Sequence, residues 1–195
     1  MQGQGEPGGT AKPLTGMPAT DDEIREKYLE RAIRELNHFT RDLQACSACP
    51  RGSLMPILGS GHPQADVFLL KYAPTASEIE EGVAFYGRSG TALMKSLKRL
   101  EIDPLAVYGT LCVKCPVADP TLADPACIVR VVDELALPLA RPVEPEPGRI
   151  QQLTPSIDAL YTPNIDEALD EDSAKRAFWS AFRALGEWYA ALPPY

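Results

Sequence analysis

The sequence predicts a single α/β domain whose strands run mostly parallel. Short apolar runs at 66–70 and 107–113 alternate with stretches of helical periodicity, and an amphipathic stretch lies toward each end of the chain. This alternation is typical of strands joined by helical crossovers. The 195 residues suffice for one domain with its own apolar core. We expect a flexible tail at 1–20, which is rich in Gly, Pro and Thr, and the domain at 21–195.

The first half of the chain begins with a predicted helix from Asp21 to about Gln44. Negative charge at Asp21 and Asp22 favours a helix start, because the N-terminal end of a helix is electropositive. Its apolar residues at helical spacing are Ile24, Tyr28, Leu29, Ile33, Leu36 and Leu43. A buried strand is predicted at 66–70, where a short apolar run is bounded by turn residues.

A glycine-rich turn at 87–90 leads into a predicted helix at 91–101. The second strand is expected at 107–113. Residues 129–132 fit either a short third strand or the start of a helix.

The last third of the chain contains a Pro- and Glu-rich linker at 141–148, a candidate strand at 157–161 and a closing helix at 166–191. The side chains expected to face inward from the closing helix are Ala168, Leu169, Phe178, Phe182, Leu185 and Trp188.

The charge balance is acidic, with a net charge of −8 and a pI of about 4.8. This argues against general nucleic-acid binding, which needs clustered Lys and Arg, although a local basic groove remains open. The basic residues that cluster are Arg88, Lys95, Lys98 and Arg99. No apolar run reaches membrane-spanning length and no signal-peptide core is present, so we expect a cytoplasmic protein without a membrane partner. We also expect a monomer.

The five cysteines point to a metal site or to free thiols, because disulfides are rare in a reducing compartment. Cys46 with Cys49, and Cys112 with Cys115, have the C-x2-C spacing that lets both thiolates bind one centre. Two sets are open: the two pairs together, as in a zinc site, or a cluster-type set in which Cys127 replaces Cys112. Strand alternation favours leaving Cys112 out as an inward-facing core residue.

Several motifs follow one another in a fixed order between Leu43 and Cys115. These are Gly59–Leu70 followed by Ala73-Pro74, then Gly82–Gly90, then Val107–Cys115. They resemble the strand ending in Gly-Glu-Ala-Pro-Gly, the Pro-Phe-Val-Gly-Arg-Ala-Gly turn and the Val-Tyr-Ile-Thr-Asn-x-Val-Lys-Cys strand of the family-4-type, iron–sulfur uracil-DNA glycosylases. The resemblance continues more weakly to the C-terminus.

The resemblance implies a three-layer α/β/α fold with a central, mostly parallel four-stranded sheet. It also implies a 4Fe–4S cluster bound by Cys46, Cys49, Cys115 and Cys127, and a role on DNA in base-excision repair. The chain departs from the family after Cys115. The segment from Cys115 to Cys127 is shorter than the family's. The helix and strand that the family inserts after the position of Cys127 are missing, which predicts an incomplete sheet.

Several polar positions of the family's active site are altered. Tyr72 stands where the family has its acidic residue, next to Ala73 and Pro74, and Tyr is a poor general base at neutral pH. Leu111 replaces the Asn that reads the edge of uracil, and Leu makes no hydrogen bond. Lys71, at the motif's first Gly, is expected to be a solvated charge.

The aromatic residue that stacks on uracil is retained as Phe85. The best match to the family's His-Pro-Ser loop is Tyr161-Thr-Pro-Asn164, and Leu153-Thr-Pro-Ser156 is a second candidate; neither contains His. By resemblance, Thr162 takes the place of the His and Asn164 lies in the substrate-binding loop. Each lost polar group of this kind typically lowers the rate about 10²–10³-fold. Three hypotheses are open: a glycosylase acting on uracil or another damaged base, an inactive module with a 4Fe–4S centre, and a zinc-stabilised scaffold that uses Cys112 in place of Cys127. The first binds uracil-containing or single-stranded DNA; the second binds DNA or another partner.

Overall fold

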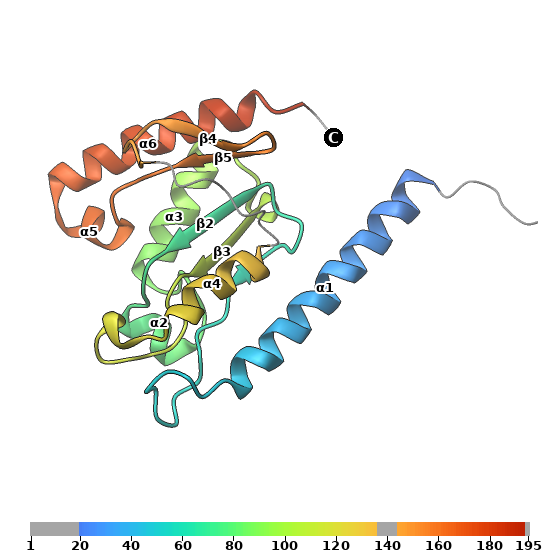
Figure 1. Ribbon diagram of the computed structural model, residues 1–195. Coiled ribbons are helices and arrows are strands. Elements are labelled where there is room, and N and C mark those ends of the chain that lie inside the picture. Colours follow the sequence, from blue (N-terminus) through green and yellow to red (C-terminus); the bar gives the residue numbers. More distant parts are fainter. Residues whose placement is uncertain (1–19, 136–143, 194–195) are drawn as a thin grey trace, which may run out of the picture.

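The computed structural model describes residues 20–135 and 144–193, and Figure 1 shows their arrangement. The tail predicted at 1–20 lies outside the described residues except for Thr20. The predicted linker at 141–148 lies partly outside them, and its described part, 144–148, contains no helix.

The main sheet has three strands, β1 (Ser60–Gly61), β2 (Val67–Lys71) and β3 (Val107–Leu111), in the order β1-β3-β2. β2 and β3 are parallel, as predicted, and pair along their whole length. β1 is antiparallel to β3. β3 is therefore central, and each of its residues is buried.

The predicted four-stranded, mostly parallel sheet is wrong for the residues described. The strand expected at 157–161 is β5 (Ile157–Leu160), but it pairs antiparallel with β4 (Ile150–Thr154) in a separate two-stranded sheet. Only two residues separate β4 from β5, and so short a connection makes a hairpin, whereas a parallel crossover needs a dozen residues or more.

The alternative of a third strand at 129–132 is also wrong, because these residues belong to helix α4 (Pro125–Glu134). The residues just before this segment explain why it is helical. The side chain of Asp124 accepts a hydrogen bond from the backbone N–H of Ala126, and Pro125 occupies the first helical position. Both features favour a helix start.

The larger core lies between the main sheet and the helices α3 (Arg88–Arg99), α5 (Ile165–Asp170) and α6 (Asp172–Ala190) (Figure 1). Its buried residues are Val67, Leu93, Leu97, Ile102, Val107, Ile165, Ala168, Phe178, Phe182 and Leu185.

The closing helix predicted at 166–191 is two helices, α5 and α6. The chain between them is extended at Glu171.

The other side of the sheet carries a smaller core and the long first helix. α1 (Asp21–Ala45) starts with a capping box between Thr20 and Glu23, which confirms the predicted helix start. Leu43 is the one residue of α1 that is fully buried, and Leu36 packs against a small cluster beneath α4. Figure 1 shows the N-terminal half of α1 extending away from the sheet.

Short helical segments complete the fold. They are α2 (Ala76–Glu81), η1 (Pro104–Ala106) and η2 (Pro120–Leu122).

Candidate metal centre and base-binding groove

Three buried cysteines from distant parts of the chain meet in the structure. Cys49 lies in the loop after α1, Cys115 follows β3, and Cys127 lies near the start of α4. Their sulfur atoms all lie within 4.8 Å of one another, and the Sγ atoms of Cys49 and Cys127 are 3.4 Å apart. Three thiolates at this separation can hold a metal, because sulfur is a preferred ligand of zinc and iron–sulfur centres.

The cysteine loop is shaped by hydrogen bonds around one guanidinium. Arg51 donates to the carbonyl oxygens of Gln44 and Cys46, at 2.9 and 2.8 Å, and to that of Leu54. The backbone N–H of Asp124, at the start of α4, donates to Sγ of Cys49 at 3.3 Å. The loop is thus folded on itself and attached to α4.

The two remaining cysteines lie outside the group of three. Cys46 is half-buried, and its Sγ lies 3.8 Å from Nη2 of Arg130, which is one turn beyond Cys127 on α4. Cys112 is also half-buried, which corrects its prediction as an inward-facing core residue. The reason is that β3 ends at Leu111, so strand alternation does not reach Cys112. The structure therefore groups Cys127, not Cys112, with Cys49 and Cys115.

Burial sets the protonation of these thiols. Desolvation raises the pKa of Cys115 to about 11, with the hydrogen bond and charge of Cys49 contributing in the same direction. Desolvation likewise raises the pKa of Cys127 to about 12. Without a metal both thiols are therefore protonated at neutral pH, and an incoming metal must displace their protons.

We therefore expect metal affinity to rise with pH through the neutral range. Each thiol that becomes a ligand releases a proton, and a higher pH favours that release. Competition with a chelator for Co²⁺ at several pH values, corrected for the chelator's own protonation, measures the dependence. An affinity that does not change with pH would show that these thiols are not the ligands.

A second feature is a buried carboxylate beneath the predicted stacking residue. Glu78 is fully buried and accepts hydrogen bonds from the backbone N–H groups of Phe85 and Thr75, at 2.6 and 2.7 Å. It also pairs with Nζ of Lys71 at 2.6 Å, and Lys71 pairs with Asp166 at 3.0 Å. Lys71 is only 7% exposed, which corrects the expectation of a solvated charge.

These contacts hold Phe85 in an unusual conformation. Its φ of 59° lies in the left-handed region, which side chains other than Gly rarely occupy. The ring packs against Gly109 in β3, where an added Cβ would lie 2.6 Å from Cδ2 of Phe85. Nζ of Lys71 lies 5.7 Å from the centre of the ring.

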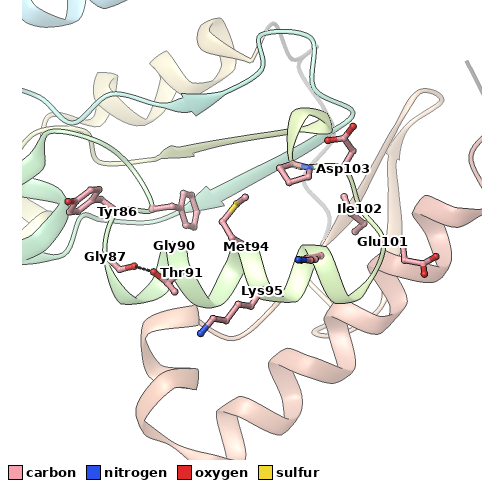
Figure 2. Close-up of a pocket in the computed structure, with 12 residues that line it drawn as sticks. Tyr86, Gly87, Gly90, Thr91, Met94, Lys95, Glu101, Ile102 and Asp103 are labelled. Atoms are coloured by element: carbon pink, nitrogen blue, oxygen red, sulfur yellow. Dashed lines mark hydrogen bonds between the residues drawn. The ribbon is translucent and has the colours of Figure 1, made fainter.

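An open groove of about 1070 Å³ begins at Phe85 and runs along α3 to residues 101–104. Tyr86, Met94, Lys95 and Lys98 also line it. Figure 2 shows that Met94 points from α3 toward the sheet, whereas Lys95 points away from it. The groove thus combines aromatic and apolar side chains with two lysines of the cluster noted in the sequence.

The other predicted site residues do not line this groove. Tyr72 is 54% exposed, and Leu111 is fully buried in an apolar cluster. The hydroxyl of Thr162 donates to the carbonyl oxygen of Pro163 at 3.0 Å, and Asn164 caps α5. The half-buried Ala73 and Pro74 belong to the turn between β2 and α2.

The sequence carries a local signal for Glu78 that the motifs above do not include. Thr75 and Glu78 have the spacing of a capping box, in which the Thr precedes the helix and the Glu occupies its third position. That pattern marks the start of α2.

No protein-family model matches the chain, and no curated protein matches it. Within the described ranges, none of the helices has the length and apolar character required to cross a bilayer.

Proposed function

We propose that this protein is a metal-bound, non-catalytic relative of the iron–sulfur uracil-DNA glycosylases that binds single-stranded DNA in the groove beside Phe85. The convergence of Cys49, Cys115 and Cys127 carries the proposal. These residues stand at three of the four positions that the resemblance assigns to cluster ligands.

The proposed centre is a 4Fe–4S cluster whose fourth ligand is Cys46. Cys46 precedes Cys49 by three residues and lies against α4, the helix that carries Cys127. The donor set of buried thiols fits such a group. When bound, the cluster would join the loop after α1 to β3 and α4.

Zinc is a second candidate, favoured by the separation of the sulfurs. Tetrahedral zinc with bonds of about 2.3 Å places its sulfur ligands roughly 3.8 Å apart. The three sulfurs, all within 4.8 Å of one another, are close to that spacing. Iron and zinc contents of the purified protein distinguish the two: brown protein with iron supports the cluster, and colourless protein with zinc supports the ion.

The surroundings of the altered positions argue against uracil excision. Leu111 is fully buried and offers no hydrogen bond, and the phenol of Tyr72 is exposed to solvent. The hydroxyl of Thr162 is engaged with a carbonyl oxygen. Excision needs donors aimed at the developing charge on the leaving base. None of these three residues provides such a donor in the groove.

The groove itself has features that suit a single strand. Bases stack on aromatic side chains without sequence preference, and lysines attract phosphates. Tyr86 is 48% exposed at the same end of the groove as Phe85, and Lys95 and Lys98 follow along α3. The net charge of −8 disfavours general binding of DNA, so the proposal places binding at this local region.

Replacing Tyr86 with Ala is therefore expected to weaken binding of single-stranded DNA about tenfold, because one stacked base is worth roughly 1–3 kcal/mol. Fluorescence anisotropy with a labelled oligonucleotide measures the change. Tyr28→Ala is the matched control, since Tyr28 is 60% exposed on α1 and is not part of the groove.

We expect the wild-type protein to release no uracil from a uracil-containing oligonucleotide. Release that disappears in Tyr72→Phe would overturn the non-catalytic proposal. Equal affinities of Tyr86→Ala and Tyr28→Ala would remove the groove as the binding site.

A further inference from the structure

A buried ion pair lies beside the cysteine group. Nζ of Lys114 is 2.5 Å from Oε2 of Glu134, and the two side chains are 0% and 1% exposed. Lys114 immediately precedes Cys115. Glu134 follows Cys127 by seven residues on α4, which places both on the same face of the helix. Lys114 is therefore next to Cys115 in the chain, and Glu134 shares a face of α4 with Cys127.

The carboxylate of Glu134 attaches α4 to β3 through two further side chains. It accepts hydrogen bonds from the hydroxyl of Tyr108 at 2.8 Å and from that of Thr110 at 2.9 Å. Both donors point from β3 toward α4. Because β3 leads directly into Cys115, these contacts set the position of α4 relative to that cysteine.

Lys114 extends the same network toward α1. Its Nζ donates to Oγ1 of Thr110 at 2.6 Å and to the carbonyl oxygen of Leu111 at 2.9 Å. It also lies 5.8 Å from the centre of the Phe39 ring, which is on the helix that leads to the cysteine loop. The pair thus contacts β3, α4 and α1, and these elements adjoin or carry the three grouped cysteines.

We propose that Lys114 and Glu134 are positioning residues that hold the sulfurs of Cys49, Cys115 and Cys127 together before any metal binds. The proposal rests on the metal centre proposed above and adds the ion pair that keeps its ligands in place without metal. The pair cannot separate without leaving a charge unpaired away from water, so the three segments stay docked in the metal-free protein.

The test is Glu134→Gln in the full chain, which keeps the shape of the side chain and removes its charge. In metal-free protein, added diamide accepts the two electrons and two protons of the Cys49 and Cys127 thiols as they form a disulfide, and mass spectrometry gives the rate. In Co²⁺-loaded protein, loss of the thiolate-to-cobalt absorption band in the presence of a chelator gives the metal release rate.

We expect Glu134→Gln to fold cooperatively, to form the disulfide more slowly and to release Co²⁺ about tenfold faster, as for other residues that support metal ligands. Arg149→Gln, which breaks an exposed ion pair with Glu146, should match the wild type in both rates. A folded Glu134→Gln protein with wild-type trapping and release rates overturns the inference. If Glu134→Gln does not fold, Tyr108→Phe, which removes one donor to the same carboxylate, takes its place under the same criteria.

The two proposals fail separately. Wild-type protein that binds no metal, yet traps the disulfide faster than Glu134→Gln, would refute the metal centre and support the positioning role.

Discussion

Replacing Cys127 with Ala is expected to abolish stable metal binding. A four-ligand structural zinc site contributes roughly 10–16 kcal/mol, so that one ligand is worth several kcal/mol and its loss lowers affinity at least about a hundredfold. Cys127 is only 2% exposed, and its sulfur is 3.4 Å from that of Cys49, so no water ligand replaces it easily. Metal content after dialysis against a chelator measures the loss.

Cys112→Ala is the matched control for this experiment. Cys112 has the same C-x2-C spacing to Cys115 as Cys46 has to Cys49, but its sulfur is outside the group of three. We expect Cys112→Ala to retain its metal. The reverse result, with metal lost from Cys112→Ala and kept by Cys127→Ala, would mean that the ligands are the two pairs alone.

The positions of the main elements could be predicted because the responsible signals are local. The apolar runs at 66–70 and 107–113 mark β2 and β3 to within two residues, and acidic residues at Asp21 and Asp22 mark the start of α1. Which strands pair could not be predicted in the same way. β5 has the apolar pattern of a sheet strand, but its partner was decided by the two-residue connection to β4.

In the candidate site, too, local sequence predicted some features and contacts between distant segments decided others. The spacing of the cysteines indicated a metal site and left Cys112 and Cys127 as alternatives, because the choice depends on how β3 ends and where α4 docks. The burial of Lys71 was not predictable from the strand alone, since its two carboxylate partners are Glu78 on α2 and Asp166, which is 95 residues away in the sequence. A charge at the end of a strand is ordinarily solvated.

Replacing Glu78 with Ala is expected to destabilise the protein by about 3–5 kcal/mol, the range found when one partner of a buried ion pair is removed. Lys71 would keep only Asp166, and the backbone N–H groups of Thr75 and Phe85 would lose their acceptor. Urea unfolding followed by circular dichroism measures the change in the free energy of unfolding.

Glu81→Ala is the control, because Glu81 is an exposed glutamate on the same helix, α2. Its effect should lie within about 0.5 kcal/mol of zero, as for most surface substitutions. If Glu78→Ala lowered the free energy of unfolding no more than Glu81→Ala does, the contact of Lys71 with Asp166 would be sufficient without Glu78.

Glu78→Gln separates charge from hydrogen bonding. Its single oxygen can still accept from Phe85, but its NH2 group faces the Thr75 N–H and Nζ of Lys71, so an effect close to that of Ala would assign the stabilisation to the contacts of Oε2 with Lys71 and Thr75. An effect close to zero would assign it to the hydrogen bonds that hold Phe85 in its left-handed conformation at the end of the groove.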